Sequence, residues 1–387
     1  MVIKVQKARF DSITLDCGKT LSPVEVAYEI YGELNSERSN AILIEHAFSG
    51  DAHAAGISEE DGKPGWWDNM IGPGKGFDTD RYCVISSNVL GGCRGTTGPS
   101  SPDPATGRPY GSSFPFVTIA DMVRLQKMLV DHLGIKRLLS VVGGSMGGMQ
   151  VLQWVVDYPE QVASTIPIAT TLQHSAQQIA FNEVGRQAIM ADTDWKGGDY
   201  YSGPGPQRGL AVARMVGHIT YMSDESMHEK FGRRRRDTGA IVNEFTGLFE
   251  VESYLRYRGG QFVSRFDANS YLTITRGMDS IDLSAGYGSL GDAFARSAAR
   301  FLVVSFTSDW LYPSYQSLQI VRTLRSRNLD VAYVELPSNH GHDAFLLEVG
   351  ELTELMKHFL ENTCKKLRPG AEASGVIPQP VAPSQAR

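Results

Sequence analysis

The sequence predicts an α/β fold, with a mostly parallel sheet that is flanked by helices and interrupted by a helical insertion. The first observation is that short apolar runs alternate with segments of helical spacing up to about residue 170, and again from residue 300. Such alternation is typical of a parallel sheet covered by helices. The second observation is that residues 171–299 contain helix-like segments and no clear strand. One interrupted core therefore explains the 387 residues better than two or three separate domains.

The first part of the core, residues 1–170, contains several candidate strands. Two short alternating segments in residues 13–33 predict an antiparallel hairpin at a sheet edge. Continuous runs of apolar and β-branched residues then predict three strands buried on both faces, and a further short strand follows. These four segments are residues 41–44, 82–86, 138–142 and 164–169.

Two helices are predicted between these strands. Apolar residues recur at helical spacing in residues 119–133. Thr118 and Asp121 occupy the positions of a capping box before this segment, and Gly134 follows it as a stop signal. The second helix is predicted at residues 149–156, after a glycine-rich turn and before a proline.

The alternation breaks in the predicted insertion, residues 171–299, where residues 176–190 and 209–221 are helix-like. It resumes in the second part of the core, residues 300–368, with a strand, a helix, a strand and a helix. These elements are predicted at residues 301–305, 314–326, 331–336 and 344–362. The last segment, residues 369–387, is rich in Pro, Ala, Ser and Gly and is expected to be disordered.

Composition and charge exclude several classes of protein. Hydrophobic residues are 42% and charged residues 21%, so a packed core is expected rather than a disordered chain. The net charge of −6 argues against a nucleic-acid partner. The sequence contains no apolar run long enough for a membrane span or a signal peptide, and its four cysteines lack the spacing of a zinc site. A cytoplasmic protein is therefore expected.

The strongest local motif is Gly-Gly-Ser-Met-Gly at residues 143–147, between a predicted strand and a predicted helix. It fits G-x-S-x-G, the nucleophile elbow of an α/β-hydrolase fold. Ser145 is therefore the candidate nucleophile, and the backbone N–H of Met146 is a candidate donor to an oxyanion. The alternative is a glycine-rich turn without chemistry.

A serine nucleophile needs a base and an orienting acid, which follow it in this fold in the order acid, then histidine. His340 and His342 both lie in the loop after the strand at residues 331–336, and spacing does not choose between them. His358 falls within the last predicted helix and is expected at the surface. Asp309 directly follows the preceding strand and is the candidate acid, with a helix-capping role as the alternative.

A second oxyanion donor is expected from the loop after the first long strand, residues 46–50. The N–H of Phe48 is the candidate and that of Ala47 the alternative. His46 precedes the nucleophile, so a structural role is preferred for it. Two other features are weaker candidates. Residues 72–76 resemble a phosphate loop but lack its spacing, and residues 233–236 are four arginines that suit a solvated face or a nucleotide phosphate.

Several segments together resemble the homoserine O-acyltransferases of the α/β-hydrolase superfamily. They occur in matching order between about residues 10 and 365, which makes the resemblance far more specific than the elbow alone. One departure is Phe48-Ser49, where relatives often carry Leu-Thr; a backbone donor there tolerates the change. The matching segments are residues 46–53, 64–68, 88–99, 143–150, 214–221, 308–313 and 341–345.

The resemblance implies a role for each site residue. It places the base in the segment Gly-His-Asp-Ala-Phe and so points to His342, with Ser145 as nucleophile and Asp309 as acid. It also implies that Arg214 binds the homoserine carboxylate and that Asp343 binds the amino group. An arginine fork suits a carboxylate, and a carboxylate suits an ammonium. Without the resemblance, Arg214 would be interpreted as a helix-surface residue and Asp343 as a helix cap.

The resemblance further implies acetyl transfer from acetyl-CoA to the side-chain hydroxyl of L-homoserine in methionine biosynthesis, by a ping-pong route through an acyl-serine. Acetyl-CoA is then a co-substrate, and neither a metal nor a bound cofactor is needed. Succinyl-CoA users tend to carry arginine where this chain has Leu311, which favours acetyl. An esterase with the same triad and a non-catalytic binding module are the alternatives. The insertion corresponds to the family's helical lid, which implies a homodimer.

Overall fold

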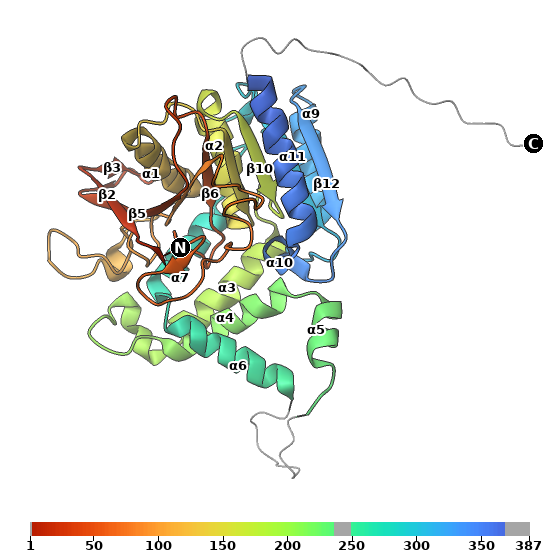
Figure 1. Cartoon of the computed structure of the whole chain (residues 1–387). Coiled ribbons are helices and arrows are strands. Elements are labelled where there is room, and N and C mark those ends of the chain that lie inside the picture. The colour runs from red at the N-terminus through yellow and green to blue at the C-terminus, as the bar shows by residue number, and fades with distance from the viewer. Residues whose placement is uncertain (1, 236–248, 368–387) are drawn as a thin grey trace, which may run out of the picture.

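The computed structural model describes residues 2–235 and 249–367 (Figure 1). Within these residues, a central eight-stranded sheet carries helices on both faces, and a further group of helices lies at one end of the sheet. This is the α/β architecture that the sequence predicts. The tail expected to be disordered, residues 369–387, and Arg236 of the arginine run lie outside the described residues.

The central sheet is mostly parallel. Its strand order is β12-β11-β10-β9-β6-β8-β5-β2, and the strands from β12 to β8 run parallel to one another. Only β5 pairs antiparallel, with β8 on one side and β2 on the other. The strands are β2 (Gln6–Phe10), β5 (Val24–Tyr31), β6 (Ala41–Glu45), β8 (Cys83–Ser87), β9 (Ser140–Gly144), β10 (Ser164–Ile168), β11 (Arg300–Phe306) and β12 (Val331–Leu336).

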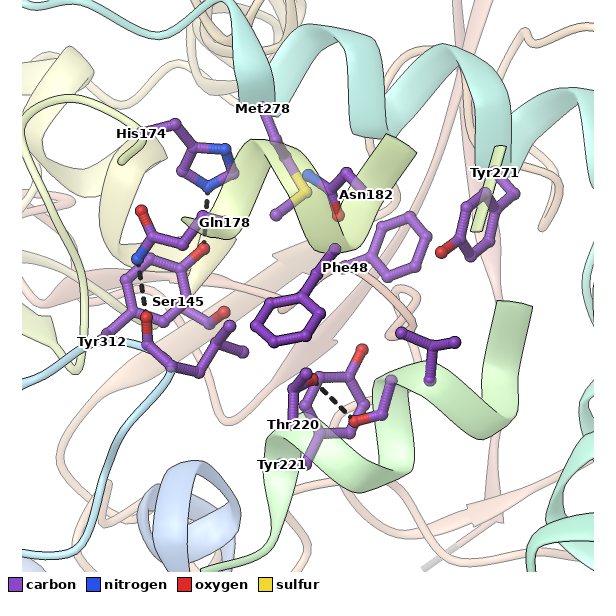
Figure 2. Close-up of a pocket in the computed structure, with 14 residues that line it drawn as sticks. Phe48, Ser145, His174, Gln178, Asn182, Thr220, Tyr221, Tyr271, Met278 and Tyr312 are labelled. Carbon is purple, nitrogen blue, oxygen red and sulfur yellow. Dashed lines mark hydrogen bonds between the residues drawn. The ribbon is translucent and has the colours of Figure 1, made fainter. Parts of the chain in front are cut away.

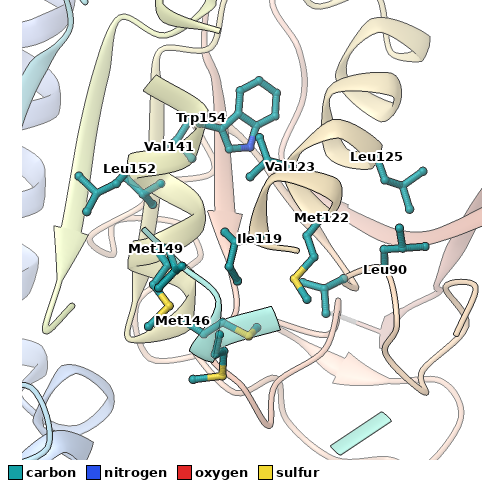
Figure 3. Close-up of a cluster of buried hydrophobic side chains, with 14 of the residues drawn as sticks. Leu90, Ile119, Met122, Val123, Leu125, Val141, Met146, Met149, Leu152 and Trp154 are labelled. Carbon is teal, nitrogen blue, oxygen red and sulfur yellow. The ribbon is translucent and has the colours of Figure 1, made fainter. Parts of the chain in front are cut away.

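Alternate residues of the central strands pack into two apolar layers, because side chains along a strand point to opposite faces. Leu43 of β6 joins one layer, while its neighbours Ile42 and Ile44 join the other. Figure 3 shows part of the first layer, in which Met122 and Trp154 come from two different helices. The first layer includes α1 (Ile119–His132), α2 (Met146–Asp157) and α9 (Ser314–Arg325), and the second includes α11 (Val349–Leu367).

The capping box predicted for α1 is confirmed. The Asp121 N–H donates to Thr118 Oγ1 at 3.1 Å, and the Thr118 N–H donates to the Asp121 carboxylate at 3.0 Å. Gly134 follows the helix with a φ of 68°, a backbone conformation that favours glycine. Local sequence therefore sets both ends of this helix.

The chain between β10 and β11 forms helices that lie at the carboxyl end of the parallel strands (Figure 1). The predicted segments at 176–190 and 209–221 correspond to α3 and most of α4, and α4 packs between α3 and α6. Within residues 171–235 and 249–299 no strand is assigned. The helices are α3 (Ala176–Met190), α4 (Gln207–Tyr221), α5 (Asp224–Phe231), α6 (Glu250–Val263), α7 (Ala268–Asp279) and α8 (Leu290–Ala293).

Two predicted elements differ from the structure. The hairpin expected in residues 13–33 is a small separate sheet of β3 (Ile13–Thr14) and β4 (Thr20–Leu21), while β5 joins the central sheet. The edge strand is β2, in which Ala8 and Phe10 face the core while Lys7 and Arg9 are exposed. The other two-residue strands, β1 (Val2–Ile3) and β7 (Ile57–Ser58), pair with each other.

The helix predicted at residues 344–362 is two helices, α10 (Ala344–Leu347) and α11. The break falls at Glu348, whose backbone is non-helical and whose carboxylate accepts a hydrogen bond from the Ser338 hydroxyl at 2.7 Å. Among the described helices, none combines the length and the apolar character that crossing a membrane requires.

Candidate active site

Ser145 forms a sharp turn between β9 and α2. Its backbone has φ 59° and ψ −123°, a left-handed conformation that a residue with a side chain rarely adopts. The Ser145 N–H donates to the Ile168 carbonyl of the neighbouring strand at 3.0 Å, which fixes the turn against the sheet. The side chain is 6% exposed, at the carboxyl end of the parallel strands. This geometry is that of a nucleophile elbow.

Small residues around Ser145 let the turn form. A Cβ atom at Gly147 would lie 2.1 Å from the Glu45 carbonyl oxygen, and one at Gly143 would lie 2.7 Å from the same atom. Side chains at either position would push α2 away from the end of β6. The glycines of the motif therefore bring the start of α2 close to the loop that follows β6.

His342 and Asp309 are joined beside the elbow. The His342 Nδ1 atom lies 2.7 Å from Asp309 Oδ2, and both side chains are buried. The other Asp309 oxygen accepts the backbone N–H groups of Leu311 and Tyr312 at 3.0 and 2.8 Å. Asp309 is thereby held in place while it orients the imidazole. The Tyr312 ring stacks on the His342 ring, with centroids 4.9 Å apart.

The structure separates the histidines that spacing left open. The side chain of His340 is 47% exposed and lies 3.8 Å from Glu348, away from Asp309. His358 is a surface residue on α11, with a side chain that is 75% exposed. The turn Gly341–Asp343 carries His342 inward, and the geometry favours His342 as the partner of Asp309.

Two backbone N–H groups are available near Ser145. Met146 is the first residue of α2, so its N–H has no acceptor within the helix. Phe48 lies in the loop after β6 and lines the same cavity as Ser145. A hydrogen bond from the Gly50 N–H to the Ala47 carbonyl, 2.8 Å long, fixes the turn of that loop. Phe48 and Met146 therefore both lie near Ser145, and their role as oxyanion donors stays a prediction.

His46 has the structural role that the sequence favoured. Its Nδ1 atom lies 2.8 Å from the Ala47 carbonyl oxygen, and its Nε2 atom accepts the Val89 N–H at 3.2 Å. Burial lowers the pKa of His46, which favours the neutral ring that these two contacts require. His46 therefore joins the loop after β6 to the loop after β8.

Arg214 and Asp343 lie near each other on the side of Tyr221. The Arg214 guanidinium lies over the rings of Phe262 and Tyr221, at 4.7 and 5.4 Å from their centroids. Its Nε donates to His218 Nε2 at 3.2 Å, and burial lowers the pKa of His218 to about 3, so that ring is a neutral acceptor. Among the described residues, the buried Arg214 Nη1 has no hydrogen-bond partner. It is available to an anionic ligand.

Asp343 directly follows His342 in the same short helical turn. Burial raises the pKa of Asp343, while the charges of His342 and Arg214 act in the opposite direction. No ion pair joins Arg214 to Asp343 among the ion pairs of the described residues. Each of the two side chains can therefore face a separate charged group of a ligand.

Ser145 lines a small, partly open cavity of about 50 Å³ (Figure 2). Leu311 lines it together with Ser145, whereas Arg214, which lies over the Tyr221 ring, and Asp343 are not part of its wall. Within residues 2–235 and 249–367, no group of three or more His, Cys, Asp and Glu side chains is placed to hold a metal ion. The wall is formed by Phe48, Ser145, His174, Gln178, Phe181, Asn182, Val216, Gly217, Thr220, Tyr221, Tyr271, Met278, Leu311 and Tyr312.

The two weaker candidates lie apart from this cavity. Residues 72–76 form a turn in which Gly76 packs against Met70. In the arginine run, Arg234 pairs with Glu250 at 2.8 Å, and both side chains are at least 40% exposed. Residues 233–235 of the arginine run are thus part of a solvent-exposed surface, one of the two roles that the sequence suggested for them.

Comparison with known proteins identifies the family. Residues 40–349 match the family model described as the alpha/beta hydrolase fold. The chain is 58% identical to the homoserine O-acetyltransferase of Solidesulfovibrio magneticus, over 90% of this chain and 89% of that one.

The chain belongs to the homoserine O-acetyltransferase family.

Solved structures agree with this family. The homoserine O-acetyltransferase of Bacillus anthracis superimposes with a TM-score of 0.87 at 32% identity, covering 93% of this chain and 98% of that one. A mutant of esterase E22 superimposes with a TM-score of 0.86 at 34% identity, covering 93% and 100%. The scaffold of the homoserine O-acetyltransferase family is therefore also found in an esterase.

In this member of the homoserine O-acetyltransferase family, a buried polar network supports the oxyanion loop, and the sequence did not predict it. The fully buried Glu45 accepts hydrogen bonds from Gln126 Nε2 at 2.7 Å and from Trp154 Nε1 at 3.1 Å. Gln126 also donates to Gln150, whose amide reaches the carbonyls of His46 and Met146 at 3.3 Å. The network thus joins the loop after β6 to α2. The only sequence signal for this network was the charged residue Glu45 at the end of an apolar strand.

The Glu45→Gln substitution should flatten the pH dependence of stability. Burial raises the pKa of Glu45 from 4.5 to about 8 in the folded state. Between these values the unfolded chain loses the proton while the folded chain retains it, so stability falls as pH rises, by roughly 3–5 kcal/mol in total. Glutamine does not titrate, so its variant should lose this decline.

Urea unfolding at pH 5 and pH 8 measures the effect. The free energy of unfolding of the unsubstituted protein should drop more between the two pH values than that of the Glu45→Gln variant. Glu351→Gln, at an exposed position of α11, is the matched control and should behave like the unsubstituted protein. Parallel pH profiles for all three proteins would contradict the assigned role of Glu45.

Proposed function

We propose that this protein transfers an acetyl group from acetyl-CoA to the side-chain hydroxyl of L-homoserine, through an acetyl ester on Ser145. The observation that carries the proposal is the buried Asp309–His342 pair beside a serine in an elbow conformation, in a chain with 58% identity to a homoserine O-acetyltransferase. The product, O-acetyl-L-homoserine, places the reaction in methionine biosynthesis. Because acetyl-CoA is the proposed co-substrate, we also propose that the protein acts in the cytoplasm.

In the first half-reaction, Asp309 holds the His342 Nδ1–H, which leaves Nε2 as the base. Nε2 takes the proton of the Ser145 hydroxyl while the oxygen attacks the thioester carbonyl. The backbone N–H groups of Phe48 and Met146 stabilise the oxyanion, and each such donor is worth about 2.7–4 kcal/mol. The C–S bond then breaks, CoA leaves as the protonated thiol, and acetyl-serine remains.

In the second half-reaction, homoserine replaces CoA. The unpartnered Nη1 of Arg214 can bind the homoserine carboxylate, and Asp343 can bind its ammonium group. His342 removes the proton of the acceptor hydroxyl, whose oxygen attacks the acetyl carbon. The bond from the acetyl carbon to Ser145 Oγ then breaks, and His342 returns the proton to Oγ. The position of Asp343 next to His342 in the chain supports an acceptor site close to the base.

Transfer requires that water compete poorly for the acetyl-enzyme. The Ser145 cavity is small, and its wall includes residues of α3 and α4 from the helical insertion. We assign residues 171–299 to a lid that limits access of water to the ester. A tightly fitting acceptor then gains the advantage of proximity over solvent.

The cavity favours an acetyl donor over a succinyl donor. A succinyl group carries a carboxylate, which needs a cationic or strongly donating partner when it is buried. The wall contains Leu311 and no Lys or Arg among its described residues. The only imidazole in the wall, His174, is already bound to Asp279 and Tyr312. Acetyl fits this environment, and succinyl does not.

Release of CoA, followed with and without L-homoserine, tests the proposal. We expect CoA release from acetyl-CoA to depend on homoserine at steady state, and acetyl-CoA to be used faster than succinyl-CoA. The second candidate is an esterase, which the similarity to esterase E22 favours. Release that is indifferent to homoserine, together with rapid cleavage of simple esters, would establish the esterase instead.

Arg214→Ala should damage the homoserine half-reaction far more than the acylation of Ser145. Removing the guanidinium leaves the substrate carboxylate without its partner, which should lower kcat/KM for homoserine by about 100-fold. A single-turnover assay of CoA release measures acylation separately. Arg208→Ala, at an exposed position of the same helix, is the control and should change neither half-reaction. Equal losses in both half-reactions would contradict the role of Arg214.

We also propose a homodimer that forms through the helical insertion. Large apolar side chains are exposed on three of its helices, which favours a partner surface there. Light scattering of the purified protein should give twice the mass of the chain, and charged substitutions at these positions should give the monomer. The exposed residues are Val184 on α3, Val212 and Ile219 on α4, and Tyr257 on α6.

A further inference from the structure

The loop after β6 carries one of the two proposed oxyanion donors, the Phe48 N–H. The core fixes the start of this loop, because His46 Nε2 accepts the Val89 N–H at 3.2 Å and the His46 carbonyl accepts the Gln150 amide at 3.3 Å. Among the hydrogen bonds of the described residues, none uses the Phe48 N–H itself. The position of this group therefore depends on what holds the Phe48 side chain and the neighbouring backbone.

Two aromatic rings of the helical insertion pack against the Phe48 ring. The centroid of the Phe266 ring lies 5.6 Å from that of Phe48, and the Tyr271 ring of α7 lies 5.0 Å away and nearly perpendicular to it. Ring separations of this size are favourable for aromatic pairs. All three side chains are buried, and Figure 2 shows Phe48 and Tyr271 in the wall of the Ser145 cavity. The insertion therefore fixes the side chain of Phe48.

Arg265, the neighbour of Phe266, holds the backbone beside Phe48. Its Nη2 group donates to the Ser49 carbonyl oxygen and to Asp51 Oδ2, each at 3.0 Å. The Asp51 side chain is only 13% exposed, so salt screens this ion pair less than a fully exposed one. Arg265 and Phe266 lie between α6 and α7, so one connecting segment contacts both Phe48 and Ser49.

The connecting segment is itself fixed within the insertion. The Phe266 N–H donates to the Phe262 carbonyl at 3.0 Å, and the two rings stack with centroids 4.6 Å apart. Asp267, the next residue, accepts the Tyr200 hydroxyl at 2.6 Å and the Ser270 N–H at 2.9 Å. A segment with these contacts can support the loop after β6.

We propose that Arg265 and Phe266 are positioning residues that hold the Phe48 N–H where the oxyanion forms. The inference rests on the proposed function, because that oxyanion exists only if Ser145 is acylated. An oxyanion donor must lie about 2.7–3.1 Å from the charged oxygen, so a small shift of the loop weakens its hydrogen bond. The helical insertion then has a role in the chemical step, in addition to limiting the access of water.

Phe266→Leu tests this role in the acylation of Ser145. Leucine keeps the site apolar and removes the ring that contacts Phe48. The burst of CoA release from acetyl-CoA in the absence of homoserine measures acylation alone. This choice avoids the acceptor site, because Phe266 stacks on Phe262 and Arg214 lies over the Phe262 ring. The burst rate should fall by about ten-fold, less than the roughly 10²–10³-fold cost of removing a whole donor.

The infrared band of the acetyl-enzyme carbonyl reports on the oxyanion donors directly. Acetyl-CoA labelled with carbon-13 at the carbonyl isolates this band, and each hydrogen bond to the carbonyl oxygen lowers its wavenumber. In Phe266→Leu the band should shift to higher wavenumber, toward that of a free ester. A substitution that only loosened the packing of the insertion, without moving the Phe48 N–H, would leave the band in place.

Arg265→Met provides a second variant, at a side chain that is 42% exposed. Methionine keeps much of the apolar stem and removes the hydrogen bonds to Ser49 and Asp51. It should slow the burst and shift the band in the same direction as Phe266→Leu. Thermal unfolding shows which variants are folded, and Arg265→Met alone decides the question if Phe266→Leu is not.

Two matched controls should keep both the burst rate and the band position. Arg81→Met removes a similarly exposed arginine, which pairs with Glu361 at 2.7 Å, and Phe294→Leu removes a buried ring of the insertion that packs on Phe301. A normal burst rate in both test variants would overturn the inference, and so would a slow burst with an unshifted band. If the unsubstituted protein formed no acetyl ester at Ser145, the proposed function would fail instead.

Discussion

Replacing Ser145 with alanine is expected to lower the rate of acetyl transfer by about 10⁶-fold, the size of loss seen when a serine nucleophile is removed from a triad. Without Oγ there is no atom to carry the acetyl group, so both half-reactions stop. His342, Asp309 and the two oxyanion donors stay in place, and they alone do not create a covalent route. Acetyl-CoA turnover and mass spectrometry of the protein after incubation with acetyl-CoA measure the loss.

Ser140→Ala is the matched control for this experiment. Ser140 lies in β9, in the same buried strand that leads to the elbow, and its hydroxyl has no partner among the described residues. Its variant should retain acetyl transfer and the mass increase of one acetyl group. Substantial activity in Ser145→Ala would mean that the acetyl group moves directly between substrates, without an acyl-serine.

Asp309→Asn should lower the rate of both half-reactions by about 10⁴-fold while the fold persists. The asparagine oxygen can still accept the N–H groups of Leu311 and Tyr312. Its amide group, however, donates to His342 Nδ1, which forces the ring hydrogen to Nε2. The imidazole then cannot take the proton of Ser145.

Pre-steady-state CoA release and steady-state transfer measure the two half-reactions of Asp309→Asn. Asp224→Asn, which removes a carboxylate at an exposed position of α5, controls for the change in net charge and should be fully active. A loss confined to one half-reaction would contradict a shared base. A collapse in the thermal stability of Asp309→Asn would contradict the expectation that its fold persists.

The turn at Ser145 and the candidate acid Asp309 could be predicted because each depends on a pattern within a short stretch of sequence. The motif around Ser145 has fixed glycine positions, and Asp309 follows directly after an apolar strand. The order of parallel strands then places both at the same end of the sheet. The fold class followed from the same alternation of strands and helices, with strand ends that differ by one or two residues.

The choice between His340 and His342 could not be made from spacing. The two residues differ in direction because Gly341, with a φ of 66°, turns the chain between them and begins a short helical turn. A side chain at Gly341 would lie 2.5 Å from the Ser223 N atom, so this turn also packs against the chain between α4 and α5. Only the tertiary contact decides which imidazole faces inward.

Glu45 and His174 could not be predicted at all. Their roles depend on partners that are far away in the chain, such as Trp154 for Glu45 and Asp279 for His174. Neither residue carries a motif of its own. Sequence patterns can identify sites whose residues are close together in the chain. A buried polar network, in contrast, forms only when distant segments pack together.

The helical insertion between β10 and β11 separates Ser145 from Asp309 and His342 along the chain. During synthesis on a ribosome, at about 5–20 residues per second, Ser145 therefore emerges roughly 10–40 s before His342. β11 and β12 must also join the edge of the sheet before the base can reach the serine. On the proposed mechanism, a nascent chain with an exposed elbow lacks its base and cannot yet consume acetyl-CoA. The enzyme becomes reactive only when almost its whole length has folded.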